Sequence, residues 1–424
     1  MPENLEKRLK RQVHGKLYRF TAIVPLGFEA TLVKELRQIG IIAENDAFET
    51  VDGKVSISAK ITDAWKALAH SRIANRVLMD IASFKAENFR ELEKKADEIP
   101  WELYLPPVPV TPDTVPVHVT CKHSRLYHSD AVAERFYDVI SESNTLLCHA
   151  PLDGASPIHS NITPQQNLYI SLLDDRCTVS LDLAGEELYK RGHQRFVNDA
   201  PLKETIAAAM LFEAFEQVQS PITLIDPMAG SGTFSLEAAY MANGLIPGKC
   251  RDFALKHQPA FKEATWNYLT RVIQSGEAAK DPGSKPAICI HTSDISDKAI
   301  EIIRHNVECS PLAKIEPAPI APQQKDFFSY TPEEIAKLRS ESQAVIVLNP
   351  PYGKRLDANA PKLYADIGKK LSEFKGYVVA ILAPKGACTD NLLKNCAALG
   401  LASTKVIKTS HGGISLNCFI GKIF

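Results

Sequence analysis

The segment ITLIDPMAGSGTF, residues 222–234, decides the fold of the C-terminal half of this chain. Its first four residues are aliphatic or β-branched and lead to Asp226, which is the pattern of a buried strand. Gly230 and Gly232 then open a helical stretch from Ser235 to Asn243, and glycines there let the backbone approach a ligand closely. The loop lacks the Gly-Lys-Ser/Thr of a phosphate loop and the third glycine of the dinucleotide spacing. This order of strand, glycine loop and helix predicts an α/β domain with a ligand at the loop.

In a second segment, VIVLNPPYG at residues 345–353, another apolar run is followed by a tetrapeptide, Asn-Pro-Pro-Tyr, that suits few kinds of ligand. Two successive prolines donate no backbone hydrogen bonds and hold φ near about −65°, so the chain leaves the sheet at Asn349 in a stiff elbow. The Asn349 side-chain oxygen and the Pro350 carbonyl can both accept from one NH2 group, while Tyr352 offers a flat face for a base. This pattern favours a site for a planar amine. An ordinary strand followed by a proline turn is the alternative interpretation.

Together the two segments resemble those of class I S-adenosylmethionine (SAM)-dependent methyltransferases that act on amino groups, whose nucleophile loop is Asn/Asp-Pro-Pro-Tyr/Phe/Trp. The resemblance implies SAM as the cofactor and no metal. It implies a catalytic loop made of Asn349, Pro350, Pro351 and Tyr352. It also implies cofactor contacts from Asp226, Pro227, Gly230, Gly232 and Thr233.

Two further acids are candidate cofactor ligands. Residues 287–291 form an apolar strand that leads to Asp294, and an acid at this place can accept from both ribose hydroxyls. Asp294 can instead, or in addition, cap the helix expected over residues 295–307. Asp326 follows a proline-rich link and is placed to accept from the adenine amino group, with Phe327 against the ring. A surface loop is the alternative for this last pair.

The order of the last elements predicts the sheet. Strands are expected at residues 377–382, 404–409 and 414–423, with a helix at 391–399. Only His411-Gly412-Gly413 separates the last two strands, whereas a parallel pair needs a crossover of about a dozen residues. The last strand must therefore run antiparallel. A parallel, Rossmann-like sheet with an antiparallel last strand is the arrangement of class I methyltransferases.

The N-terminal half resembles the THUMP-containing methyltransferases that modify guanine in bacterial large-subunit ribosomal RNA, the RlmL-like family, which has relatives acting on tRNA. The matching segments are FTAIVPLGFE at 20–29, SRLYH at 124–128 and DLAGEELYKRGH at 182–193. In that family the THUMP unit holds structured RNA and the Rossmann-like unit performs the chemistry. The resemblance therefore implies an α/β methyltransferase domain preceded by an α+β, ferredoxin-like and THUMP RNA-binding region.

The chain is expected to have five parts. They are a basic tail or short helix over 1–15, a ferredoxin-like unit over 16–84, a THUMP-like RNA-binding domain over 85–182, a linker over 183–200, and the methyltransferase domain over 201–424. Pro201 opens the first helix of the last part. By the resemblance, residues 200–205 lie over the methionine end of the cofactor; an inter-domain clamp is the alternative.

Candidate RNA contacts lie in two basic segments. Residues 121–128 form a basic, aromatic turn after a strand, in which Lys122, Arg125 and Tyr127 suit phosphates and bases. Its Cys-x-His spacing is not that of a recognised metal site. Lys354 and Arg355 follow the elbow and are placed to hold a flanking phosphate, with a solvated pair as the alternative. Because the family commonly has Gly-Glu-Arg there, the nucleotide that is modified stays open.

Composition excludes several classes of function. A net charge of −1 over 424 residues argues against coating nucleic acid along the whole surface, so any basic surface is local. Nine cysteines without a Cys-x-x-Cys pair favour reduced thiols in a cytoplasm over disulfides or a zinc site. The N-terminus is not a signal peptide, and no apolar stretch is long enough to span a membrane.

Two rival functions compete with RNA methylation. The elbow alone does not separate guanine from adenine amines, so a DNA adenine methyltransferase is one rival, against which the RNA-type N-terminal half argues. The other is a non-catalytic RNA-binding assembly factor. An intact Asn349 and the Gly230/Gly232 pair make that factor the weaker interpretation.

Overall fold

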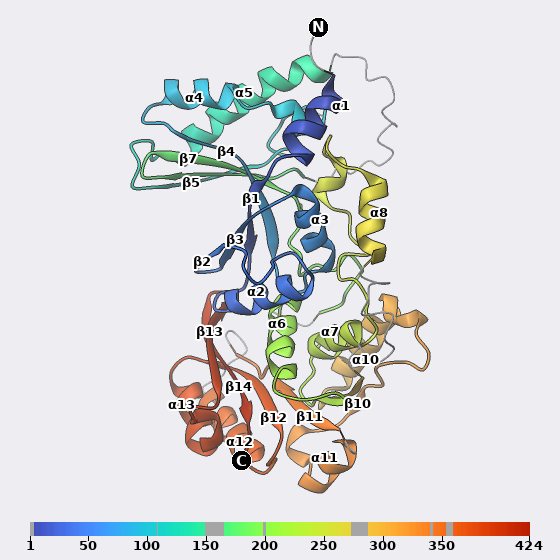
Figure 1. Ribbon diagram of the computed structural model, residues 1–424. Coiled ribbons are helices and arrows are strands. Elements are labelled where there is room, and N and C mark those ends of the chain that lie inside the picture. The colour runs from blue at the N-terminus through green and yellow to red at the C-terminus, as the bar shows by residue number, and fades with distance from the viewer. Residues whose placement is uncertain are drawn as a thin grey trace.

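The computed structural model describes residues 4–107, 109–148, 165–197, 201–272, 287–339, 342–352 and 359–424 (Figure 1). Two seven-stranded sheets organise these residues. The first has the order β2-β3-β1-β4-β7-β6-β5 and the second the order β10-β9-β8-β11-β12-β14-β13. The first sheet lies in the upper part of Figure 1 and the second in the lower part.

The first sheet joins residues 16–84 and 85–182, which the sequence predicts as separate parts, in one hydrogen-bonded surface. Its strands are β1 (Tyr18–Ile23), β2 (Phe48–Val51), β3 (Lys54–Ala59), β4 (Arg76–Lys85), β5 (Val117–Lys122), β6 (Leu168–Leu173) and β7 (Arg176–Asp182). The link between the two parts is the antiparallel pair β4–β7. The hairpin between β6 and β7 turns at Asp174 and Asp175, which have φ angles of 50° and 60°.

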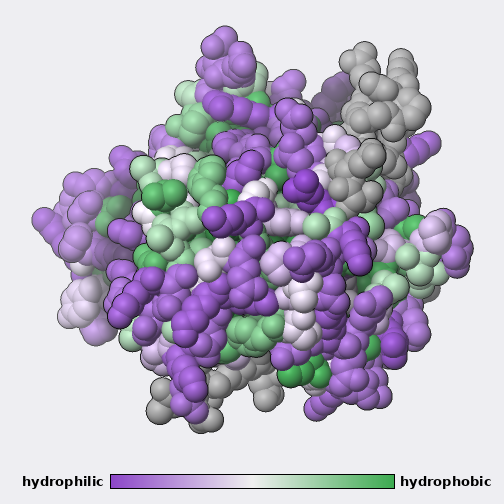
Figure 2. Space-filling model, turned by 90° about the horizontal axis from the view of Figure 1, so that it is seen from below, coloured by the Kyte–Doolittle hydropathy of each residue, from purple (hydrophilic) through white to green (hydrophobic). Residues whose placement is uncertain are grey.

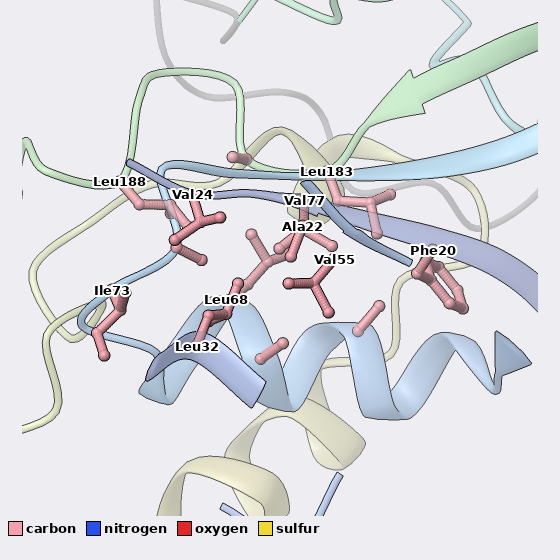
Figure 3. Close-up of a cluster of buried hydrophobic side chains, with 14 of the residues drawn as sticks. Phe20, Ala22, Val24, Leu32, Val55, Leu68, Ile73, Val77, Leu183 and Leu188 are labelled. Carbon is pink, nitrogen blue, oxygen red and sulfur yellow. The ribbon is translucent and has the colours of Figure 1, made fainter. Parts of the chain in front are cut away.

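Helices α2 (Glu29–Gln38) and α3 (Ile61–His70) cover one face of β1, β3 and β4. In α3 the buried residues Ile61, Ala64, Trp65 and Leu68 follow the helical period, which places them on one face. Figure 3 shows Leu32 of α2 and Leu68 of α3 beneath Val55 and Val77 of the sheet. Further helices of this part are α4 (Phe89–Asp97) and α5 (Ser129–Cys148).

The segments expected as a tail and a linker are both packed. Helix α1 (Leu5–Arg8) and the π-helix Leu9–His14 take the short-helix alternative, and Val13 is fully buried. After β7, Leu183 and Leu188 join the core cluster of Figure 3. Residues 183–197 therefore run across the ferredoxin-like core, while residues 198–200 lie outside the described part of the chain.

The second sheet has the expected topology. Its strands are β8 (Ile222–Asp226), β9 (Ile288–Asp294), β10 (Gln323–Gln324), β11 (Gln343–Leu348), β12 (Val378–Pro384), β13 (Lys405–His411) and β14 (Ile414–Lys422). Strands β8, β9, β10, β11 and β12 are parallel. Strand β14 runs antiparallel to both β12 and β13, which confirms the prediction from the short turn. It lies inside the sheet, so β13 forms the edge.

Helices cover both faces of this sheet. They are α6 (Glu204–Phe215), α7 (Thr233–Ala242), α10 (Asp297–Glu308), α11 (Pro332–Arg339), α12 (Ala360–Ser372) and α13 (Ala387–Asn395). The inserted helix α8 (Glu263–Val272) contacts α3, and Trp65 packs against Phe261, which packs against Trp266. From the sequence, the insertion over residues 246–286, which contains Trp266 and Tyr268, is expected to be helical and to pack on the substrate side. The described part of α8 and its neighbours lies against the ferredoxin-like unit, where Phe261 packs on Trp65 of α3.

The face of the molecule seen from below is mainly polar (Figure 2). Seen from below, hydrophilic side chains dominate, and the apolar ones form separate small areas (Figure 2). None of the helices in the described residues is long and apolar enough to cross a bilayer.

Candidate active site

The carboxyl ends of three parallel strands bring the sequence-predicted site residues together. β8 pairs with β9 through Asp226 and Thr292, and with β11 through Ile225 and Ile346. Because the strands are parallel, the glycine loop, Asp294 and the elbow at Asn349 leave the sheet at the same edge. Ligands of open α/β sheets bind at this edge.

Asp226 braces the glycine loop from below. Its side chain is 1% exposed and accepts from the Ser235 hydroxyl at 2.7 Å and from the Ser235 backbone N–H at 3.3 Å. Burial raises the pKa of Asp226 to about 7, against which the Ser235 bonds work. The carboxylate therefore holds the start of α7 through one of its oxygens, and the contact with the cofactor stays a prediction. Pro227, next to it, is also buried.

The two glycines of the loop serve different purposes. Gly230 has φ +56°, and a Cβ built there would meet nothing within 4 Å. Gly232 has φ +78° and sits against Ile303, whose Cγ1 would lie 3.1 Å from an added Cβ. The space beside Gly230 is thus open to a ligand, whereas Gly232 lets the loop pack on α10.

Asp294 is half-buried at the end of β9 and binds two backbone groups. Its carboxylate accepts from the Gly230 N–H at 2.8 Å and from the Ser296 N–H at 2.9 Å. The cap of α10 is Ser296, whose hydroxyl accepts from the Ala299 N–H. The cap alternative for Asp294 is therefore wrong. A carboxylate has about four acceptor sites, so both oxygens keep capacity for ribose hydroxyls.

Ile295 is a site candidate that the sequence interpretation missed. Its side chain is 65% exposed, although it is aliphatic and follows Asp294 at the ligand-binding edge. An exposed aliphatic side chain beside a hydrogen-bonding carboxylate offers an apolar surface to a flat ring. Its local sequence, Ser-Asp-Ile-Ser, carries no periodic signal that would single it out.

Asp326 lies next to Asp294, because the Lys325 N–H donates to the Asp294 backbone carbonyl at 2.9 Å. The Asp326 side chain accepts from the Phe328 N–H at 3.0 Å and caps a short 3-10 turn. Phe327 is only 2% exposed and packs edge-to-face on Phe374 in the core. Its ring has no free face, which corrects the expectation that it packs on an adenine.

The elbow places an unsatisfied acceptor at the site. The side-chain oxygen of Asn349 is buried and has no hydrogen-bond partner among the described residues. Tyr352 is half-buried, and its hydroxyl lies 3.0 Å from His411 Nδ1. The sequence interpretation used His411 only as part of a turn. Lys354 and Arg355 lie outside the described residues.

The segment before α6 also reaches the glycine loop. Arg195 forms an ion pair with Glu204 and donates to the Ser231 hydroxyl at 3.1 Å and to the Thr233 hydroxyl at 2.5 Å. The Thr233 hydroxyl oxygen thus accepts a hydrogen bond from Arg195. A cavity of about 560 Å³ lies against this pair, lined by the following residues: Glu186, Tyr189, Lys190, Arg191, Gly192, His193, Arg195, Val197, Pro201, Leu202, Lys203 and Glu204. Arg195 has no signal in the sequence, since its partners in the glycine loop, Ser231 and Thr233, are 36 and 38 positions away.

The candidate RNA contacts on the first sheet lie away from this edge. Tyr127 is 69% exposed with its ring against His128, and Arg125 is exposed and paired with Glu87. Lys122 is exposed at the end of β5. Strand β5 is in the upper part of Figure 1 and β11 in the lower part. Within the described residues, no cluster of His, Cys, Asp and Glu could hold a metal ion.

Comparison with known sequences gives one family match in each half of the chain. Residues 191–414 match the UPF0020 family model, an RMKL-like methyltransferase domain, and residues 19–78 match an RlmL ferredoxin-like domain. The ribosomal RNA large subunit methyltransferase K/L of Allochromatium vinosum is 30% identical over 405 residues, which cover 93% of this chain and 50% of that protein. YpsC of Bacillus subtilis, provisionally named an RNA methyltransferase, is 26% identical over 411 residues, covering 95% of this chain and 96% of its own. The chain thus spans about half the length of the K/L relatives it matches.

Solved structures share the fold over nearly the whole chain. SMU.472, provisionally described as a methyltransferase and solved with SAH, has a TM-score of 0.74 at 25% identity and covers 96% of this chain and 98% of its own. TrmN from Thermus thermophilus has a TM-score of 0.64 at 18% identity, covering 96% and 100%, which is a likeness of fold. Since the family model spans more than half of the chain and includes both the glycine loop and the Asn-Pro-Pro-Tyr elbow, this protein belongs to the UPF0020 family of RMKL-like methyltransferases.

Proposed function

We propose that this protein transfers the methyl group of SAM to the exocyclic amine of a base in structured RNA, with a guanine of large-subunit ribosomal RNA as the target. The observation that carries the proposal is the buried side-chain oxygen of Asn349, which has no partner among the described residues. A buried acceptor without a hydrogen-bond partner lowers the stability of the fold by about 1–3 kcal/mol. A donor that arrives with the substrate accounts for it.

The cofactor fits the residues that surround this oxygen. The open space beside Gly230 admits a ligand against the loop backbone, and Asp294 can accept from ribose hydroxyls. Ile295 offers the exposed apolar face for the adenine ring, and Asp326 lies beside it. When bound there, SAM supplies an electrophilic methyl group.

The residues of the elbow then orient the amine. Asn349 and the Pro350 carbonyl accept its two N–H groups, which turns the nitrogen lone pair out of the amine plane. Tyr352 stacks on the base and holds it in position. The methylated nitrogen is a strong acid and loses its extra proton readily, so the site needs no strong general base.

The two halves divide the work in this proposal. The target base must leave its stack to reach Tyr352, which costs a few kcal/mol and favours loops or opened RNA. Residues 16–84 and 85–182 hold the RNA outside the target loop, and Lys122, Arg125 and Tyr127 are the exposed groups suited to this. Lys354 and Arg355 are placed to hold the phosphate next to the target base.

The experiment combines binding with turnover. Isothermal titration with SAM and SAH tests the cofactor site, and transfer of labelled methyl to total RNA from a strain lacking the protein tests the reaction. Mass spectrometry of the modified nucleosides then identifies the base. N2-methylguanosine in the large-subunit RNA is the expected product. Label in tRNA would change the RNA target, and a parallel reaction with DNA that yields N6-methyladenine would make DNA the substrate. Binding of SAH without transfer to RNA or to DNA would favour an assembly factor.

A further inference from the structure

The aromatic residue of the elbow is held by a strand from the far edge of the second sheet. The Tyr352 hydroxyl lies 3.0 Å from His411 Nδ1, and the two rings meet edge-to-face with centroids 6.2 Å apart. His411 is the last residue of β13 and is followed by Gly412 and Gly413, which have φ angles of 58° and 79°. This glycine turn sends the chain straight back into β14 and leaves the histidine at the tip of β13.

Burial, together with the charge of Lys203, lowers the pKa of His411. The ring is therefore neutral near pH 7, and Nδ1 can accept from the tyrosine hydroxyl. A hydrogen bond at the end of the Tyr352 ring and a perpendicular ring beside it restrict rotation of that ring. A base stacks on an aromatic face only if the face is correctly turned, so this restriction acts on target capture.

Among the described strands β13 pairs only with β14 and forms the edge of the sheet, so contacts outside the sheet must hold its other side. The ferredoxin-like unit supplies this support. The loop before α2 comes so close that a Cβ on Gly27 would lie 2.3 Å from the Lys408 carbonyl oxygen and 2.8 Å from the Ile407 side chain. Figure 1 shows the end of β13 reaching up to α2.

A buried carboxylate ties the other end of β13 to the same unit. Glu213 of α6 is 3% exposed and accepts from Lys405 Nζ and from the Thr31 hydroxyl, each at 2.6 Å. Lys405 begins β13 and Thr31 belongs to α2, so α6 joins the N-terminal unit to the strand. Buried charged hydrogen bonds of this kind hold geometry, because breaking one leaves an unpaired charge.

We propose that His411 is a positioning residue that sets the orientation of the Tyr352 ring for the target base, and that the ferredoxin-like unit holds the strand that carries it. This inference rests on the proposed function. In this inference the ferredoxin-like unit has a second role besides holding RNA. Its contacts with β13 keep His411, and through it the ring of Tyr352, in place.

A double-mutant cycle tests the pair. His411→Phe keeps a ring and removes the acceptor, Tyr352→Phe removes the donor, and His411→Gln keeps a side-chain acceptor. Each Phe variant should lower kcat/KM for methyl transfer about three- to tenfold, the range expected for one hydrogen bond, with SAH affinity unchanged. The double variant should lose no more than either single one, and His411→Gln should recover part of the loss. Losses that multiply, or a loss of SAH binding, would overturn the assignment.

A second readout does not depend on turnover. Crystal structures of the wild type, His411→Gln and His411→Phe should show one ring orientation for Tyr352 in the first two and a changed or multiple orientation in the third. An unchanged ring in His411→Phe overturns the inference whether or not the protein methylates RNA. A wild type that binds SAH but methylates no nucleic acid would instead sink the proposed function.

The role of the N-terminal unit has its own variants. Gly27→Ala should disturb β13 through the close approach to Lys408, and Lys405→Met should remove the bond to Glu213 with less risk to folding. Both should lower kcat/KM for RNA while SAH affinity stays unchanged. If Lys405→Met and a folded Gly27→Ala both retain wild-type kcat/KM, the unit does not act through β13.

Discussion

The backbone N–H of Gly230 donates to the carboxylate of Asp294 at 2.8 Å, which fastens the glycine loop after β8 to the end of β9. The same carboxylate accepts from the Ser296 N–H just before α10. Asp294 thus shapes the loop as well as facing the space beside it. A ligand that meets Asp294 therefore meets a loop that is already in position, which reduces the ordering cost of binding.

Asp294→Ala should weaken SAM and SAH binding about ten- to several-hundredfold. Two charge-assisted hydrogen bonds to the ribose are worth about 1.5–3 kcal/mol each, and water replaces part of the loss. Isothermal titration measures the effect. Ser296→Ala is the matched control, because it removes the cap of α10 at a cost of about 1 kcal/mol in stability without touching the ligand. If the Asp294→Ala variant and the wild type bound SAM and SAH with equal affinity, the role of Asp294 would be limited to holding the glycine loop.

Asn349→Ala should remove most methyl transfer and leave cofactor affinity nearly intact. The loss of one placed acceptor in a water-excluded site costs about 2.7–4 kcal/mol, or roughly a hundred- to a thousandfold in kcat. Asn349→Asp keeps an acceptor and should retain more activity than Asn349→Ala. Single-turnover rates with saturating RNA measure both variants. A near wild-type rate for Asn349→Ala would make the elbow a structural turn and exclude the amine mechanism.

Asp226→Asn should flatten the pH dependence of stability. Burial raises the pKa of Asp226 from 3.8 to about 7, so the folded protein binds this proton more tightly than the unfolded chain. The contribution of Asp226 to the free energy of unfolding therefore falls as the pH rises from about 4 to about 7. The amide keeps an acceptor for Ser235 but carries no charge. Urea midpoints at about pH 5 and about pH 8 should differ less in the variant, and parallel changes in both proteins would contradict this account.

Lys122→Ala and Tyr127→Ala should weaken RNA binding without changing SAH affinity. The lysine substitution should also reduce the slope of log affinity against log salt by up to about 1, because one phosphate contact is lost. The tyrosine substitution should cost about 1–3 kcal/mol of stacking and leave the slope unchanged. Filter binding at several salt concentrations separates the two. Unaltered RNA affinity in both variants would show that RNA binds at another surface.

Deleting residues 1–180 is a poorer test of RNA binding, since α2 contacts α6 and the loop before it contacts β13, so the deletion also removes support from the methyltransferase domain.

Local patterns in the sequence determined most of the elements. The strands predicted over residues 377–382, 404–409 and 414–423 form as β12, β13 and β14, because runs of apolar and β-branched residues are local signals. The direction of β14 followed from the three-residue turn before it, since chain length alone forbids a parallel crossover. Strand β2 was missed because all four of its side chains are exposed and show no alternation.

The tertiary structure alone decided how the site residues are used. The sequence located the glycine loop and the elbow because strand ends and prolines are local signals. It could not show that Asp226 turns inward to Ser235, that the Phe327 ring is buried, or that Thr233 is bonded to Arg195. His411 and Tyr352 are 59 positions apart in the chain, and only the pairing of β13 with β14 and of β14 with β12 brings them together. Contacts of this kind depend on how segments that are distant in the sequence pack together. A local sequence pattern does not show which distant segments become neighbours in space.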